Sequence, residues 1–214
     1  MNFNFHKLDS VLGLTHYWLF NNGLIRMKDT SLTHGAAAKL SPNRFGEPRS
    51  ALEFNRGYSV VRPGAYFQRE FTITLWFKLS ENQQYIHVFD FGNGASKNNF
   101  ILLIANNYQI LFERYHGNRV ERLHGPIIEL NKWSFIAIIK KSLQLKLIMN
   151  NQILSSVYSN YTGNAMTQFN YFGRSNWKND PLTKGCISDV RIFNRGLSLN
   201  EAIYQQYTME EMSP

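Results

Sequence analysis

The stretch Phe71-Thr-Ile-Thr-Leu-Trp-Phe-Lys-Leu79 alternates strictly between two sets of side chains. The odd-numbered positions are all large and apolar, whereas the even-numbered ones are Thr, Thr, Trp and Lys. Side chains of a strand point alternately to opposite faces of a sheet, so a period of two is typical of a β-strand with one buried face. Leu143–Asn150 alternates in the same way. Both stretches therefore predict strands.

Working outward, short apolar runs recur along the chain between clusters of Gly, Asn and Pro. Trp133–Ile139 is apolar on both faces, as expected of a central strand that is covered on two sides. Asn150-Asn151 and Asn106-Asn107 separate apolar runs and predict tight turns, because Asn tolerates positive φ. Further strands are expected at Tyr85–Phe91, Phe100–Ala105 and Tyr108–Arg114.

One helix is expected, at the C-terminal end. Ser198-Leu-Asn-Glu201 forms a capping box, in which Ser caps the third amide of the helix and Glu reaches back to the cap. It opens a short helix over Leu199–Tyr207. The apolar residues Leu199, Ala202, Ile203 and Tyr207 are expected to pack on the edge of the sandwich.

Length and composition indicate one globular domain over residues 1–214. The 214 residues are 43% hydrophobic, 18% charged and 14% aromatic. A chain of this length buries a sizeable core and needs no disulfide or bound metal to stabilise it. The single cysteine excludes an intrachain disulfide. No apolar run is long enough to span a bilayer, so membrane insertion is not expected. No signal peptide is visible at the N-terminus.

The formal net charge of +8 favours acidic partners such as acidic glycans. The basic residues are scattered, however, and no run of five or more exists. No nucleic-acid-binding motif accompanies them, so nucleic acid is not an expected partner.

Seven segments, taken in chain order, resemble laminin-G-like, concanavalin A-like jelly-roll domains. The resemblance covers residues 15–207. It rests on His16-Tyr-Trp-Leu-Phe20, Phe45–Gly57, Phe71–Lys78, Lys132-Trp-Ser-Phe-Ile-Ala-Ile138, Leu147-Ile-Met-Asn-Asn-Gln152, Phe172-Gly-Arg-Ser175 and Lys184–Ser198.

The resemblance implies an all-β fold, a two-sheet antiparallel jelly-roll sandwich with a short C-terminal helix. It also implies a non-catalytic binding module of a surface or secreted protein, in an extracellular setting. We expect a carbohydrate-binding, lectin-like domain that favours anionic glycans. Two alternatives stay open: a protein–protein adhesion module without a sugar site, and a glycoside-active enzyme.

Catalytic patterns are missing from the sequence. Glucanases of this superfamily place two acids on one strand face in a Glu-x-Asp-x-Glu-like motif, whereas Glu113, Glu121 and Glu129 are eight residues apart. The six histidines show no metal-binding spacing. Cys186 has no basic neighbour to activate it and is expected to be a small buried residue. An enzyme is therefore not expected.

Calcium at the sandwich rim is a further property that the resemblance implies. The matching positions offer Asn55 and Asp180 as ligands, but Asn55 stands where relatives have Asp, beside Arg56. Extracellular calcium sites use several carboxylates. Calcium therefore stays an open alternative, and no other cofactor is expected.

The loop around Trp177 is the predicted ligand site. Trp18 and Trp133 match core positions of the family, and Trp76 either packs beneath a crossing loop or lines the concave sheet. Trp177 lies in a polar segment, where an indole offers a sugar ring an apolar face. A simple packing role for this indole is the alternative. The expected ligand-binding residues are Arg174, Asn176, Trp177, Lys178 and Asp180, beside loops 92–99 and 115–119.

Overall fold

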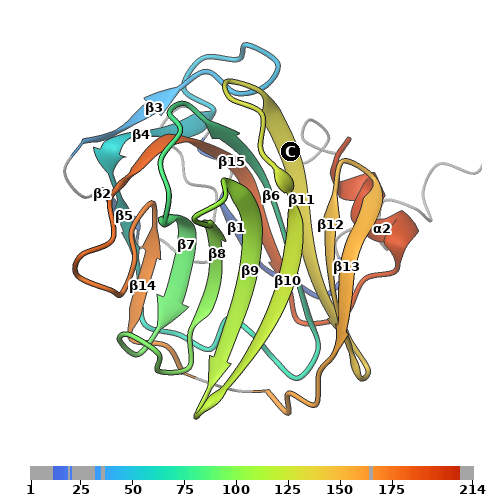
Figure 1. Ribbon diagram of the computed structural model, residues 1–214. Helices are drawn as coiled ribbons and strands as arrows, with labels where there is room; N and C mark the ends of the chain where they lie inside the picture. The colour runs from blue at the N-terminus through green and yellow to red at the C-terminus, as the bar shows by residue number, and fades with distance from the viewer. Residues whose placement is uncertain (1–11, 19, 21–31, 35–36, 164–165, 208–214) are drawn as a thin grey trace, which may run out of the picture.

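Two antiparallel sheets face each other in the computed structural model, which describes residues 12–18, 20, 32–34, 37–163 and 166–207 (Figure 1). The eight-stranded sheet has the order β13 (Gln152–Tyr158), β12 (Gln144–Met149), β11 (Trp133–Lys141), β6 (Phe71–Leu79), β15 (Thr183–Phe193), β4 (Ala51–Gly57) and β3 (Ala38–Ser41), and β1 (Leu14–Trp18) pairs with the second half of β15. The seven-stranded sheet has the order β10 (Arg119–Ile127), β9 (Gln109–His116), β8 (Phe100–Ile104), β7 (Ile86–Gly92), β14 (Phe169–Phe172), β5 (Ser59–Val61) and β2 (Leu32–His34). The predicted jelly-roll sandwich is confirmed.

The core lies between the sheets and draws on both of them. The five odd-numbered side chains of β6 are fully buried in one cluster with inward-facing residues of β7, β8 and β9. Aromatic rings fill its centre, and Phe67 stacks on Phe100 with ring centroids 4.2 Å apart. The alternation that predicted this strand is therefore the alternation that builds the core.

The outward face of the eight-stranded sheet is covered as well. Helix α2 (Leu199–Gln205) begins with the predicted capping box, in which Ser198 and Glu201 satisfy each other's backbone N–H. Its buried residues are Ala202, as expected, and Gln205. Ile203 is half-buried, whereas Leu199 and Tyr207 are exposed, so the expectation was wrong for those two residues. The small Ala202 lets the helix approach the sheet closely, and Leu197 just before the helix fills the apolar space there.

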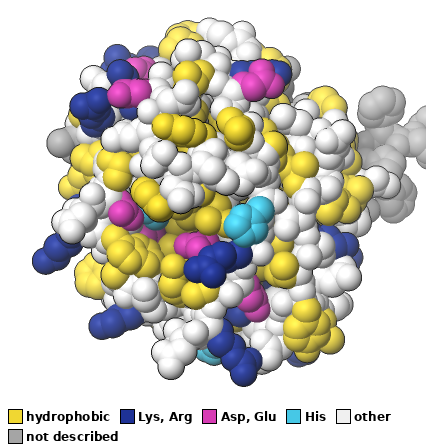
Figure 2. All heavy atoms as spheres, in the orientation of Figure 1, with side chains coloured by type: hydrophobic (Ala, Val, Ile, Leu, Met, Phe, Trp, Pro, Cys, Tyr) yellow, Lys and Arg dark blue, Asp and Glu magenta, His cyan; other side chains and the backbone are white. Residues whose placement is uncertain are grey.

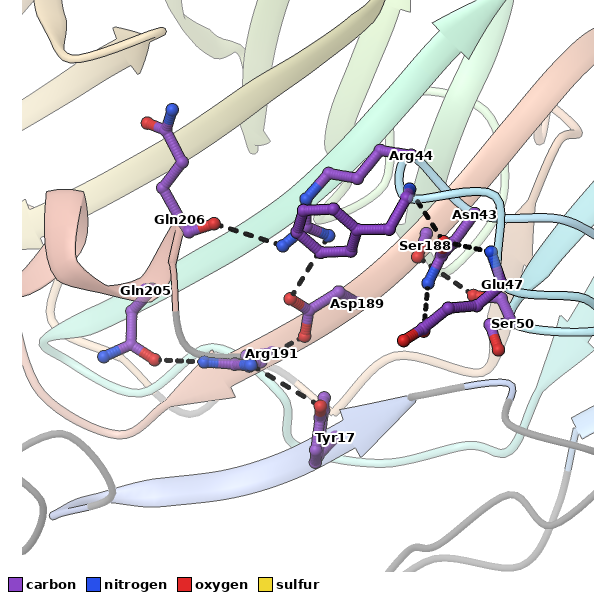
Figure 3. Close-up of polar contacts among 11 residues, drawn as sticks. Tyr17, Asn43, Arg44, Glu47, Ser50, Ser188, Asp189, Arg191, Gln205 and Gln206 are labelled. Atoms are coloured by element: carbon purple, nitrogen blue, oxygen red, sulfur yellow. Dashed lines mark hydrogen bonds and ion pairs between the residues drawn. The ribbon is translucent and has the colours of Figure 1, made fainter. Parts of the chain in front are cut away.

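A buried ionic network ties this helix to β15 and to the loop before β4 (Figure 3). The guanidinium of Arg191 donates to Asp189 at 2.8 Å and to the side-chain carbonyl of Gln205 at 2.6 Å. Arg44 pairs with the same Asp189 carboxylate at 3.9 Å and donates to the backbone carbonyl of Gln206 at 3.1 Å. Asp189 is therefore held by cations from two separate segments, as a buried carboxylate requires.

Arg44 also covers Trp76, with its guanidinium carbon 4.2 Å from the ring centroid. Trp76 is 8% exposed, so it packs beneath a crossing loop and offers no ligand surface. The predicted turn at Asn150-Asn151 is confirmed, because both residues have positive φ, 45° and 72°. Cys186 is buried, as expected, and burial raises the pKa of its thiol. No helix in the described part of the chain is both long and apolar enough to cross a membrane.

Candidate functional site

The loop between β14 and β15, residues 173–182, is held to the seven-stranded sheet by a buried carboxylate on β7. Asp90 is fully buried, and its Oδ2 accepts the backbone N–H of Asn176 at 2.8 Å. Its Oδ1 accepts from the side-chain amide of Asn99 at 2.8 Å. Burial raises the pKa of Asp90 to about 6, although both hydrogen bonds act in the opposite direction. The loop is therefore anchored at Asn176, one residue before the indole.

Ser175 fixes the geometry of the next turn. Its hydroxyl oxygen accepts the backbone N–H of Trp177 at 2.9 Å and donates to Oδ2 of Asp180 at 2.8 Å. The backbone N–H of Asp180 donates in turn to the carbonyl of Trp177 at 3.3 Å. Trp177 and Asp180 are thus placed next to each other by one small hydrogen-bonded turn.

The indole of Trp177 lies over the outward face of the seven-stranded sheet. It stacks on His87 of β7, with centroids 6.4 Å apart and rings 21° from parallel. It also meets Tyr115 of β9 at 5.4 Å and packs on an apolar cluster of Ile101, Leu103 and Leu111. The indole is half-buried. Part of it therefore packs on the sheet, and the remainder is free to contact a ligand.

Beside the indole is an open hollow of about 350 Å³. Figure 2 shows hydrophobic side chains gathered over β7–β9, with acidic, basic and histidine side chains among and beside them. The floor is apolar and comes from β8 and β9, while three aromatic residues and several polar groups stand around it. The lining residues are Tyr85, His87, Ile101, Leu103, Ala105, Asn106, Leu111, Glu113, Tyr115, Trp177 and Asp180.

His87 is buried and lines this hollow. Its Nδ1 donates to the backbone carbonyl of Tyr85 at 3.2 Å, because a carbonyl oxygen can only accept. Burial lowers the pKa of His87 to about 4, so the ring is neutral at pH 7. Its Nε2 is therefore an acceptor, and it lies 3.8 Å from Oδ2 of Asp180. Burial raises the pKa of the Asp180 carboxyl.

Glu113 supplies the second carboxylate of the hollow. It accepts from the hydroxyl of Tyr115 at 3.2 Å and from Nε of Arg122 at 2.6 Å. Arg122 comes from the neighbouring strand β10, where it is paired with Glu113 in the strand register. The two contacts hold the Glu113 carboxylate in one orientation against the hollow.

Of the five residues predicted for the site, two line the hollow and three do not. Trp177 and Asp180 both line the hollow, and their ligand-binding role stays a prediction. Asn176 anchors the loop, and its side-chain amide donates to the carbonyl of Phe169 at 3.0 Å. Lys178 is exposed.

The remaining residue, Arg174, lies over a different pair of rings, 4.8 Å from the centroid of Tyr58 and 4.9 Å from that of Tyr171. It does not line the hollow.

Sequence reasoning missed the sheet's contribution to the site. Leu111, Glu113 and Tyr115 alternate along β9 and share its outward face, and this signal was present in the sequence. No local sequence pattern indicated that His87 belongs to the site, because its role depends on β7 lying next to β14. The 115–119 segment does reach the site, through Tyr115.

The two residues predicted for calcium have different surroundings. Asn55 is exposed on β4, opposite Lys184 of β15 in the strand register. Asp180 is engaged with Ser175. Within the described part of the chain, no group of three or more His, Cys, Asp or Glu side chains could hold a metal ion. Calcium binding stays a prediction.

A family model described as the concanavalin A-like lectin/glucanases superfamily matches residues 55–202, more than half of the chain. The chain belongs to this superfamily. Its structure is similar to domain 4 of AbnA, a GH43 extracellular arabinanase from Geobacillus stearothermophilus, in complex with arabinotriose. The TM-score is 0.71 at 17% identity, over 90% of this chain and 97% of that one.

This superfamily member is also similar to the binding domain of botulinum neurotoxin serotype D/C, with a TM-score of 0.71 and 13% identity. The alignment covers 93% of this chain and 53% of the toxin domain, so the chain spans about half of that domain. The binding domain of neurotoxin DC in complex with SialylT gives a TM-score of 0.70 at 12% identity, over 93% and 52% of the two chains. At such identities the likeness shows the fold alone. No curated protein sequence matches the chain significantly.

Proposed function

We propose that this chain is a non-catalytic, carbohydrate-binding module whose ligand occupies the hollow beside Trp177. The observation that carries the proposal is the half-buried indole, held by Ser175 over an apolar floor and beside Tyr115. A sugar ring has one face of C–H groups and a rim of hydroxyls. It fits an aromatic platform bordered by a few fixed polar groups.

The polar groups at the hollow suit hydroxyl recognition. The carboxylates of Asp180 and Glu113 accept hydrogen bonds, and each is already held by a neighbouring side chain. Because these groups are fixed before binding, little conformational entropy is lost when a ligand arrives.

Two structures of similar fold, at low sequence identity, support a carbohydrate ligand. One similar structure is a domain of an extracellular arabinanase in complex with arabinotriose, and another is a toxin binding domain in complex with SialylT. A third structure, of the same toxin binding domain, is in complex with the protein synaptotagmin II, so a protein ligand is the second candidate. We propose an extracellular setting for this chain on the same grounds.

A glycan array followed by calorimetric titration of the best hits tests the proposal. Trp177→Ala should abolish binding, because it removes the platform. Trp177→Phe should retain part of it. The matched control is Tyr158→Ala, which removes an aromatic residue that is 68% exposed on β13 and lies on the other sheet.

Stability must be measured on the same variants. Since the indole packs on Ile101, Leu103 and Leu111, Trp177→Ala should lower the free energy of unfolding by about 2 kcal/mol, so binding is compared at a temperature where each variant is folded. The proposal would be contradicted if no glycan on the array bound, or if binding were retained in Trp177→Ala. Hydrolysis of a bound glycan would instead indicate a glycoside-active enzyme.

A further inference from the structure

We infer that the hollow selects glycans that carry a free, protonated amino group and disfavours acidic glycans, although the chain as a whole has a net charge of +8. This inference rests on the proposed function and names the class of sugar. It reverses the preference that the overall charge suggests, because a ligand responds first to the groups that it contacts.

The first observation is that two of the polar groups at the hollow, Nε2 of His87 and the carboxylate of Asp180, accept hydrogen bonds. The Nδ1–H of His87 is used by the carbonyl of Tyr85, which leaves Nε2 as an acceptor on a side chain that is only 3% exposed. No hydrogen bond from the described residues reaches this Nε2. Because His87 lines the hollow, a ligand that carries a donor can pair with this nitrogen.

The second acceptor is Oδ2 of Asp180, 3.8 Å from Nε2 of His87. Two acceptors at this separation, with no donor between them, can share one group that carries several N–H bonds. An ammonium group has three donors and no acceptor, whereas a carboxylate or a sulfate has only acceptors. The pair therefore suits an amine and repels an anion.

The charges point the same way. Among the residues that the structure describes, the charged ones that line the hollow are Glu113 and Asp180. Arg122 neutralises Glu113 from outside the lining, and the guanidinium of Arg174 lies over Tyr58 and Tyr171. Asp180 thus leaves the lining with a negative charge. The ion pair of Asp180 with an ammonium ligand would be strengthened by partial burial.

The aromatic rings at the hollow also favour a cationic ligand. Tyr85, Tyr115 and Trp177 all line the hollow, and the face of each ring attracts a cation. A sugar amine in the hollow would meet the Asp180 carboxylate on one side and these rings on another. An N-acetyl group would lose the charge and two of the three donors.

Calorimetric titration with four trimers that share one linkage tests the inference: glucosamine, N-acetylglucosamine, glucose and glucuronic acid. The glucosamine trimer should bind about ten-fold more tightly than the two neutral trimers, and the glucuronic acid trimer most weakly. Asp180→Asn should reduce the affinity for the glucosamine trimer about ten-fold more than it reduces the affinity for the neutral trimers, because only the amine loses an ion pair. Glu129→Gln, which alters an exposed acid away from the hollow, is the matched control.

The outcomes separate the inference from the proposed function. If the neutral trimers bind as tightly as the glucosamine trimer and Trp177→Ala abolishes both, the inference is wrong and the function stands. If no trimer or array glycan binds, both are wrong. Binding of a lysine-rich peptide that depends on Asp180, with no binding of any trimer, would overturn the inference in favour of a protein ligand.

Discussion

Nε2 of His87 and Oδ2 of Asp180 face each other across 3.8 Å, and the neutral imidazole presents Nε2 as a hydrogen-bond acceptor. His87 is neutral because it is buried, and its one N–H is used by the carbonyl of Tyr85. Three residues along the same strand, Asp90 is buried as well and anchors the loop that carries Asp180. Burial acts in opposite directions on the pKa values of His87 and Asp90.

The contributions of His87 and Asp90 to the stability of the protein should therefore nearly offset each other between pH 6.5 and 4. His87 has a folded-state pKa of about 4 against about 6.5 unfolded, so its contribution falls by about 3 kcal/mol as the pH drops through this window. Asp90 has a folded-state pKa of about 6 against about 3.9 unfolded, so its contribution rises by about 2 kcal/mol over the same window. The two pH dependences of the unfolding free energy, one from each residue, nearly cancel.

Asp90→Asn removes the contribution of Asp90 to the pH dependence of the unfolding free energy, and it keeps an acceptor for the N–H of Asn176. Between pH 7 and pH 4 this variant should lose about 2 kcal/mol more unfolding free energy than the parent chain. Urea unfolding followed at several pH values measures the difference, with Glu129→Gln as the control for a lost exposed charge. Parallel pH profiles for Asp90→Asn and the parent would show that burial does not set these pKa values.

The capping box of α2 should be worth a measurable amount of stability. Ser198→Ala removes the acceptor for the N–H of Glu201 and should cost about 1 kcal/mol. Ser156→Ala on β13, an exposed position of an edge strand, is the matched control and should be close to neutral. Thermal melts compare the two. Equal melting temperatures would mean that the helix does not depend on its cap.

Millimolar calcium should leave the melting midpoint unchanged. Any ion that binds the folded state stabilises it by mass action, so a site at Asn55 or Asp180 would raise the midpoint relative to EDTA. Asp180 is already engaged with Ser175, and Asn55 lies opposite Lys184 in the strand register. A rise that Asp180→Asn abolishes would establish a calcium site and refute this expectation.

The fold was accessible from the sequence where burial is strong. β6 and β11 could be predicted because apolar residues occupy every second position or the whole strand. β10, at Arg119–Ile127, was missed because it is an edge strand that contains Gly125 and Pro126 and fully buries only one apolar side chain, Leu123. Edge strands commonly carry such residues, which weaken the periodic signal.

The site was only partly accessible for a related reason. An indole in a polar loop marked Trp177, but its contacts with His87 and Tyr115 depend on which strands become neighbours, and no local pattern fixes that order. The placement of Arg174 over Tyr58 and Tyr171 is likewise a long-range contact. Local sequence thus indicated the loop, and tertiary pairing determined which of its side chains line the hollow.

The backbone carbonyl of Leu12 accepts a hydrogen bond from Arg195, which lies shortly before the α2 segment. Residue 12 and this segment thus lie together on the sheet opposite the hollow. A linker joined at residue 12 or residue 207 would leave the hollow turned away from its support. Several copies coupled in this way to a bead or a tetrameric carrier could engage one glycan surface together, and weak single contacts would add up to strong avidity.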